Sequence, residues 1–380
     1  MNLGTMSLNL GKLFSKSSLS DTLNLKTEGK CSLINAFWPH LNLTPSDYDD
    51  EEYENLLSFW GETLQSLNHH HHRFAAKSWN DLLEIVAQLK SKPNDERGLL
   101  MDDIKNHYSN TSDEEIACSL ELAVRLWLGI RVRSNGPSVG FVNLRDSQIH
   151  WPNDQSLKSM VAAPFLRGAR KAQSATYFLF DESFTAVGLR ETCRLRIRWT
   201  DSLVDHLKME GPRGKRQLSI FKHKICIVNH RRGSQPTIIP ADVLDETLRT
   251  LDLLFPYGDK PTKIFLEHSK VHMWIMNPME SPRATELDEF VYWRSRLAQL
   301  LSLFHGPPET VRQTLLDSRN TAQFATLWVA IFGVFFLTIL FGVLSTVYSA
   351  KQYHVAVDSY KLALAQACQQ TSPPIPGFCA

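Results

Sequence analysis

The chain has 380 residues, which allows two or three compact units, and 43% of its residues are hydrophobic against 21% charged. Lysine and arginine number 41 and aspartate and glutamate 40, so the net charge is only +1. This balance excludes a global basic excess, and we predict no nucleic-acid partner. Four cysteines lie singly in apolar contexts, as a reducing compartment permits: Cys31, Cys118, Cys193 and Cys226.

The N-terminal third begins with a segment that shows no secondary-structure period. Residues 1–30 are rich in Ser, Leu and Asn and lack the continuous apolar core of a secretory signal, so we predict a disordered leader. Residues 31–134 are predicted to be mainly helical. The indications are acidic residues at 47–54, apolar residues at helical spacing over 81–90, and the capping box Ser112-x-x-Glu115.

Residues 135–320 are predicted to form an α+β region that ends in helices leading to a membrane. Apolar residues at 193, 195, 197 and 199 alternate with arginines, as in a half-buried strand, and 218–228 resembles a second strand. The arginines Arg194, Arg196 and Arg198 would share one strand face and require acidic partners. Helices are predicted after Pro240 and over residues 286–304.

A basic stretch follows the first predicted strand and allows two interpretations. It could be the solvated face of a sheet, or it could contact anionic lipid headgroups or phosphate. Its members are Arg213, Lys215, Arg216, Lys222, Lys224, Arg231 and Arg232.

A transmembrane helix is predicted within residues 321–350, which contain no charged residue. The apolar run from Phe324 to Tyr348 would reach roughly 37 Å at about 1.5 Å per residue, enough to cross a hydrocarbon core of about 30 Å. Trp328 and Tyr348 lie near its two ends, where aromatic rings favour the interface. The run contains no ionisable Asp, Glu, His, Lys or Arg side chain, so we predict no ion or proton relay within it.

Residues 351–380 are predicted to form a helical tail with a proline-rich end. Cys368 and Cys379 flank this end, and they either form a disulfide in an oxidising lumen or stay free. Without a signal peptide, the large N-terminal part is expected in the cytosol. Asn110 opens the sequon Asn-Thr-Ser, which would be glycosylated only if that part were lumenal.

Residues typical of an active site are not apparent. The four consecutive histidines at 69–72 would point in different directions on a helix, so we predict a polar surface segment and no metal site. The chain lacks G-x-S-x-G, G-x-x-x-x-G-K-[ST], G-x-G-x-x-G and H-E-x-x-H. We therefore predict no catalytic residue and no cofactor, and lean against an enzyme.

Several strings resemble a family of uncharacterised membrane proteins from filamentous fungi. They are residues 197–207 (IRWTDSLVDHL), 221–224 (FKHK), 245–256, 290–297 and 318–320. The resemblance covers roughly residues 190–380 and implies a cytosolic-looking domain before one C-terminal membrane helix. A more distant similarity to CorA-type magnesium channels implies ion transport. Those channels have two membrane helices and a Gly-Met-Asn signature, whereas this chain has Val347-Tyr348-Ser349 at that place.

The sequence thus predicts an α+β, predominantly helical soluble region followed by one transmembrane helix. We expect a single-pass membrane protein that serves interaction or regulation, with the lipid bilayer and a protein partner or second copy as partners. One alternative is a partial CorA-like ion-transport subunit that works as an oligomer. Another is a membrane-tethered accessory protein or enzyme of fungal secondary metabolism.

Overall fold

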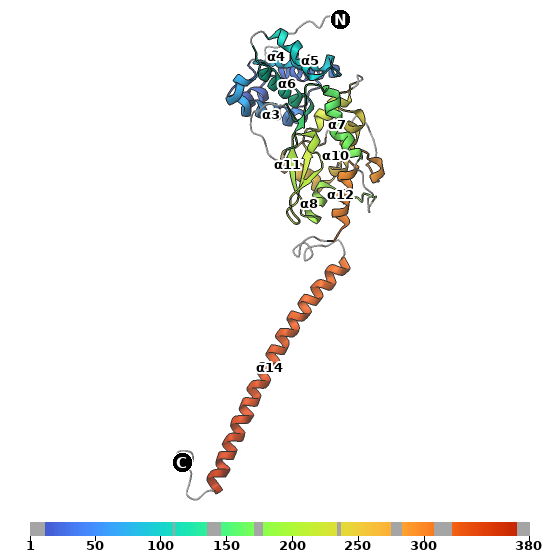
Figure 1. Cartoon of the computed structure of the whole chain (residues 1–380). Helices are drawn as coiled ribbons and strands as arrows, with labels where there is room; N and C mark the ends of the chain where they lie inside the picture. Colours follow the sequence, from blue (N-terminus) through green and yellow to red (C-terminus); the bar gives the residue numbers. More distant parts are fainter. Residues whose placement is uncertain are drawn as a thin grey trace. The chain divides into compact units, whose positions relative to one another are not determined.

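A computed structural model of the chain describes residues 12–108, 111–134, 146–170, 178–233, 237–274, 283–307 and 321–370 (Figure 1). The chain divides into two compact units, Met1–Thr310 and Val311–Ala380. The first unit is helical with a few short strands, and the second contains one long apolar helix. The predicted fold class, a mainly helical α+β region followed by an apolar C-terminal helix, is confirmed.

The first part of unit 1 is made of helices, and those at Asp50–Leu67, Trp79–Ser91 and Asp113–Leu128 lie where the sequence indicates them. Ser112 caps α6 in a reciprocal capping box with Glu115, as predicted. Ser78 and Asp81 form a second capping box at the start of α4. The elements are α1 (Ser18–Leu23), α2 (Thr27–Phe37), η1 (Pro39–Leu41), α3 (Asp50–Leu67), η2 (Asn68–Arg73), α4 (Trp79–Ser91), α5 (Arg97–His107) and α6 (Asp113–Leu128).

The prediction of a disordered leader is wrong for residues 12–30, which fold. Leu13 is buried, and its backbone N–H donates to the carbonyl of Lys77. Helix α1 packs on α3. A six-residue helix is too short to show a clear apolar period by itself, so its order comes from tertiary packing. Residues 1–11 lie outside the described part of the chain.

The second part of unit 1 holds a small three-stranded sheet. Its order is β3-β5-β4, with β3 parallel and β4 antiparallel to β5. The predicted strand at 193–199 is observed as β3 (Arg196–Thr200); β4 (Lys208–Glu210) and β5 (Gln217–Phe221) form a hairpin, and β1 (Val132–Arg133) pairs with β2 (Ile149–His150). The helices of this part are α7 (Leu157–Arg170), α8 (Ala186–Thr192), η3 (Leu203–Asp205), α9 (Lys224–Arg231), α10 (Ala241–Leu254), α11 (Lys260–Ser269), η4 (Leu287–Glu289) and α12 (Arg294–His305).

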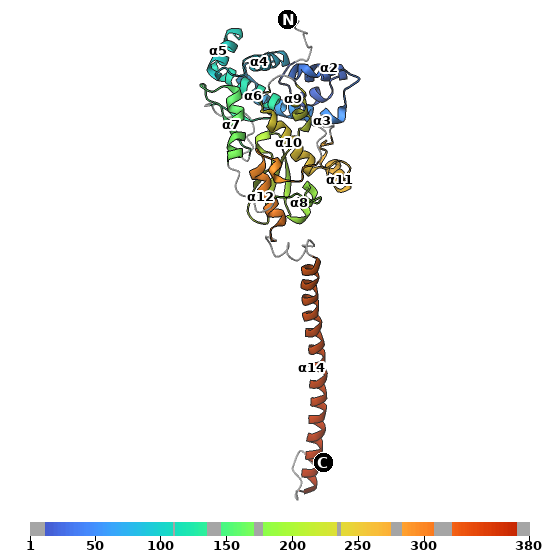
Figure 2. The ribbon, with the colours of Figure 1, turned by 90° about the vertical axis from the view of Figure 1, so that its right-hand side faces the viewer.

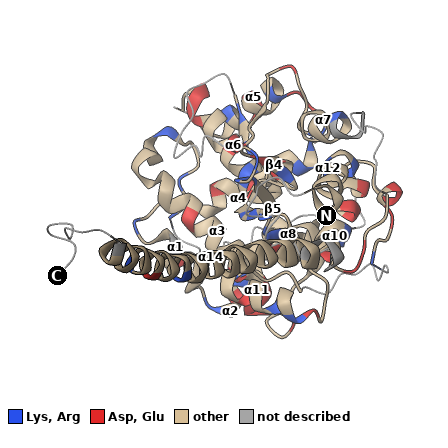
Figure 3. Ribbon diagram, turned by 90° about the horizontal axis from the view of Figure 1, so that it is seen from below, with Lys and Arg blue, Asp and Glu red and all other residues tan. Residues whose placement is uncertain are grey.

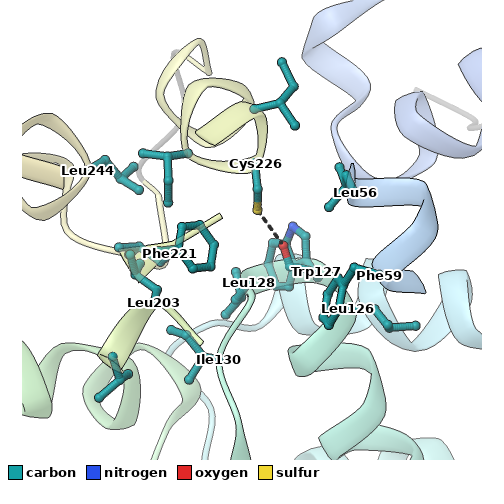
Figure 4. Close-up of a cluster of buried hydrophobic side chains, with 14 of the residues drawn as sticks. Leu56, Phe59, Leu126, Trp127, Leu128, Ile130, Leu203, Phe221, Cys226 and Leu244 are labelled. Carbon is teal, nitrogen blue, oxygen red and sulfur yellow. Dashed lines mark hydrogen bonds between the residues drawn. The ribbon is translucent and has the colours of Figure 1, made fainter. Parts of the chain in front are cut away.

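One hydrophobic core joins the predicted helical region and the predicted α+β region across residue 134. In Figure 4, Phe59 of α3 and Trp127 of α6 lie beside Phe221 and Cys226 of the second part. The Cys226 thiol donates to the Trp127 carbonyl at 3.7 Å. Residues from Leu13 to Phe304 belong to the same buried cluster.

The second predicted strand, residues 218–228, is wrong after Phe221, because α9 replaces it. The four consecutive apolar residues Ile225 to Val228 are all buried. A short continuous apolar run does not distinguish a strand from a helix that is covered on all sides. Helix α9 packs against both α3 and α10, and this packing selects the helix.

The predicted helix over residues 286–304 is interrupted between η4 and α12. The Glu246 carboxylate of α10 accepts hydrogen bonds from the backbone N–H groups of Val291, Tyr292 and Trp293 at 2.7, 2.8 and 3.2 Å. These donors would otherwise bond within the helix. Glu246 lies 45 or more residues before these donors, so the spacing of apolar residues around the break could not predict it.

The described part of unit 2 is α14 (Thr321–Gln370), a continuous helix of 50 residues. Its portion Ala325–Gln369 is long and apolar enough to cross a membrane, by length and composition, and no part of its most apolar window is buried. The predicted apolar segment and the predicted helical tail are thus one helix. Figure 2 shows α14 from a second direction.

Candidate functional site: a basic surface at one end of the sheet

The predicted basic stretch divides into a half that faces inward and a half that faces outward. In the inward half, Lys222 Nζ lies 3.0 Å from the Asp201 carboxylate, and His223 Nε2 lies 2.9 Å from the same oxygen. Lys224 Nζ binds Asp252 at 2.6 Å, and its side chain is only 4% exposed. Lys222 and Lys224 satisfy acids of their own unit and are not available to a ligand.

The ionisation of the inward half follows from its burial. Burial disfavours the charged form of Asp201, but hydrogen bonds and charge from His223 and Lys222 outweigh it and hold the Asp201 pKa well below its usual range. Burial lowers the pKa of His223, and the nearby Asp201 only partly offsets this. Arg231, the next member, is paired with Asp245 at 2.5 Å. We conclude that this half serves the structure of unit 1, through ion pairs that are buried or half-buried.

The outward half lies in the turn that joins β4 to β5. Arg213 and Lys215 are exposed there. Gly211 has φ +99°, and a Cβ on it would lie 2.8 Å from the Lys215 carbonyl oxygen, so the tight turn requires glycine. The turn therefore holds the two basic side chains at the end of the hairpin, away from the core.

Two arginines from β3 lie at the same end of the sheet. The strand register pairs Gln217 with Arg196 on one side and with Glu210 on the other. Arg196 and the preceding Arg194 are exposed. We call Arg194, Arg196, Arg213 and Lys215 the sheet-end surface. Figure 3 views the unit from the direction in which β4, β5 and α8 are visible.

The sheet-end surface has no acidic partner within the described residues. None of its four members forms an ion pair there, and the nearby Glu210 is paired with Lys208 at 2.7 Å. The prediction that Arg194, Arg196 and Arg198 all require acids holds only for Arg198, which binds Asp146 at 2.9 Å. The alternation of apolar and basic residues in the sequence did not identify Arg194 and Arg196 as part of this surface. Only the pairing of β3 with β5 places them beside the turn.

The remaining two residues of the basic stretch are not part of the surface. Arg216 is half-buried, and its guanidinium contacts the Met209 sulfur at 3.7 Å. Arg232 is exposed but follows α9, on a different element.

An open groove of about 590 Å³ lies between α8 and α11. Helix α8 ends at Thr192, two positions before Arg194 of the sheet-end surface. Its lining mixes basic and apolar side chains. The Arg190 guanidinium lies over the Phe265 ring at 5.1 Å, and Ile264 is 68% exposed. Lys260 and His268 complete the basic part, against one acid, Glu191. The groove therefore extends a basic region with apolar surface.

The other predicted site residues lie in unit 2 or outside the described part. Trp328 and Tyr348 are in α14, as is the backbone of Phe324; the Trp328 ring stacks on Phe332 at 5.4 Å. Cys368 is disulfide-bonded, while Cys379 lies outside the described residues, so their pairing stays a prediction. Asn110 also lies outside them.

The histidine run, residues 69–72, lies in the 3-10 helix η2 and is exposed. Across the described ranges, no group of three or more His, Cys, Asp or Glu side chains could hold a metal ion.

Comparison with family models, with curated proteins and with solved structures found no match to this chain. The resemblance to the fungal membrane proteins and to CorA-type channels therefore stays a prediction.

Proposed function

We propose that this chain is a single-pass membrane protein whose folded N-terminal unit serves interaction or regulation at the membrane surface. The observation that carries the proposal is the exposure of α14. Val334, Phe335 and Phe341 are each more than 60% exposed, and apolar side chains surround this part of the helix. Full burial of each large apolar side chain contributes about 1.5–3 kcal/mol, and a lipid bilayer provides that burial on every face.

The length of the apolar segment supports a single crossing. Trp328 and Tyr348 are 20 positions apart in one uninterrupted helix, which corresponds to about 30 Å along its axis. This equals the thickness of a typical hydrocarbon core, so both rings would lie at the interfaces that aromatic residues prefer. The Thr338 and Thr346 hydroxyls donate to the carbonyls of Val334 and Gly342, which satisfies them inside lipid.

An interaction role is favoured by how the polar groups of unit 1 are used. Several ionic residues of unit 1 hold elements together, as Asp201 joins β3 to the start of α9 and Glu246 joins α10 to residues 291–293. By contrast, the four cations at the end of the sheet are exposed and form no ion pair within the described residues. Exposed charge without an internal partner is suited to contacts with other molecules.

The first experiment tests membrane insertion. Full-length chain in microsomes should resist extraction at alkaline pH. The matched variant Leu337→Asp/Ile339→Asp should be extracted, because each aspartate at the helix centre costs about 3 kcal/mol on the insertion scale. Extraction of the unaltered chain would contradict the proposal.

Orientation is tested on the same microsomes. We expect protease to digest unit 1 and Asn110 to stay unglycosylated, because unit 1 is proposed to face the cytosol. A protected and glycosylated unit 1 would reverse the topology.

The transport alternative has its own test. Ion flux through proteoliposomes that contain the full chain would favour a CorA-like subunit. Absence of flux together with co-purifying partner proteins would favour the interaction role.

A further inference from the structure

We propose that the sheet-end surface, Arg194, Arg196, Arg213 and Lys215, binds the anionic headgroups of the membrane that holds α14. This inference rests on the proposed function, in which α14 spans that membrane. It specifies which part of unit 1 faces the lipid and what chemistry it recognises there.

The first argument is unbalanced charge. All four side chains are exposed, and none forms an ion pair within the described part of the chain. By contrast, Lys222, Lys224 and Arg231 of the same sequence region each have an aspartate within 3.0 Å. Four cations held on one rigid sheet end create a local positive potential, which attracts an anionic surface within about one Debye length, roughly 8 Å at physiological salt.

The second argument is where the chain leaves unit 1. The last turn of α12 lies against the residue that precedes the surface, because the Cys193 thiol donates to the Leu303 carbonyl at 3.6 Å. The Phe304 ring packs edge-on against Phe184, just before α8, with 5.4 Å between centroids. Figures 1 and 2 both show α8 and the end of α12 at the same end of unit 1, opposite α4 and α5.

The tether that follows α12 limits the distance to the membrane. Fifteen positions separate His305 from Thr321, the ends of α12 and α14. Even fully extended, they span at most about 50 Å. The end of α12 is thus the point of unit 1 nearest the anchor along the chain, and it contacts Cys193, next to the basic side chains. Docking of this end to lipid is therefore an intramolecular event with a high effective concentration.

The third argument distinguishes a lipid surface from a free phosphate. The groove between α8 and α11 adds Arg190 and Lys260 to the basic region and displays Ile264, which is 68% exposed. Tyr257, just before α11, is 86% exposed. Apolar side chains next to cations gain energy by entering the headgroup layer, whereas a soluble phosphate offers them nothing.

The test uses the full chain in nanodiscs, with hydrogen exchange read at residues 194–217. Nanodiscs contain either phosphatidylcholine alone or phosphatidylcholine with 30% phosphatidylserine. We expect slower exchange at these residues only with phosphatidylserine. The variant Arg213→Glu/Lys215→Glu should lose at least tenfold of that protection, since each basic residue near such a surface contributes about a factor of five. The control variant Lys16→Glu/Lys158→Glu makes the same change of charge at exposed sites, one just before α1 and one in α7. It should keep the protection.

Three results would overturn the inference. They are equal protection in both lipids, protection lost equally in the control variant, and protection produced by inorganic phosphate with phosphatidylcholine alone. A salt titration of the unaltered chain needs no variant, and protection should disappear as salt rises from about 0.1 M to 0.5 M. Exchange at residues 325–350 reports insertion separately, so rapid exchange there would contradict the proposed function and not the charge argument.

Discussion

Two groups of basic residues only a few positions apart have opposite fates in this protein. Arg213 and Lys215 lie in a glycine-containing turn and face solvent, whereas the half-buried Lys222 and the buried Lys224 bind Asp201 and Asp252. The residue type does not separate them. Their neighbours do, because the second group flanks a buried apolar run that draws the charged residues inward with it. Basic residues in such a stretch therefore stay exposed only where the neighbouring segments are not themselves buried.

The largest effect is expected from acid, which acts through two buried histidines of unit 1, His206 and His230. Burial lowers the pKa of His206 to about 3 and that of His230 to about 4. Below pH 6.5 the unfolded chain takes up protons at these sites and the folded chain does not, so stability falls as pH decreases from 6.5 toward these values. Between pH 7 and 5 each histidine should cost about 2 kcal/mol, or about 4 kcal/mol together.

The measurement is the free energy of unfolding of the full chain in nanodiscs at several pH values, followed by tryptophan fluorescence. His230→Gln keeps a donor for the Trp127 carbonyl, which His230 Nε2 contacts at 3.0 Å. It should remove about half of the pH dependence. A pH dependence that the variant leaves unchanged would contradict the assignment.

Removal of the Asp201 carboxylate should have the next largest effect on the free energy of unfolding. Asp201→Ala leaves Lys222 and the buried His223 without their partner, and because Asp201 itself is only half-buried we expect a cost of about 2–3 kcal/mol. The matched control is Asp103→Ala, whose partner Lys92 is 44% exposed at the side chain. We expect the control to cost at most about 0.5 kcal/mol by denaturant titration. Equal costs would remove the distinction between inward and outward charge.

Glu246 tests the same distinction between inward and exposed charges with an acidic residue. Glu246→Gln weakens the acceptor for three backbone N–H groups and should destabilise unit 1 by about 2 kcal/mol, since hydrogen bonds to charged groups are the stronger ones. Hydrogen exchange should accelerate most at residues 291–297. Glu267→Gln, at an exposed site 3.9 Å from Lys263, serves as the control and should change neither quantity. Faster exchange spread evenly over unit 1 would argue against a local role.

The smallest effect is expected in the outward half. Arg213→Glu/Lys215→Glu reverses two charges that no described residue balances, so the free energy of unfolding should change by no more than about 0.5 kcal/mol. Lys222→Glu, next to Asp201, should destabilise by several times that amount. A large loss from the turn variant would show that its charges serve the fold.

Local signals in the sequence identified several elements because their causes lie within one turn of helix. The Ser112–Glu115 capping box marks the start of α6, and the residue after Pro240 begins α10. The α9 segment and the break before α12 were not predictable in this way. Their causes are α3 and α10 around α9, and Glu246 beneath residues 291–293, all distant in sequence.

The candidate site was half predictable for the same reason. Arg213 and Lys215 stand out as exposed because their turn is marked by glycine and proline. Arg194 and Arg196 join them only through the parallel register of β3 and β5, which no local pattern encodes.

By itself, the sequence determined the apolar helix, because 30 positions without a charged residue meet the length and composition that a bilayer requires. It also determined the helical character of the chain through caps and spacing. Only the tertiary structure decided that residues 12–30 fold, that residues on both sides of position 134 share one core, and which basic side chains stay exposed. Burial depends on which distant segments meet, and a charge is held inside or displayed according to whether those segments bring it a partner.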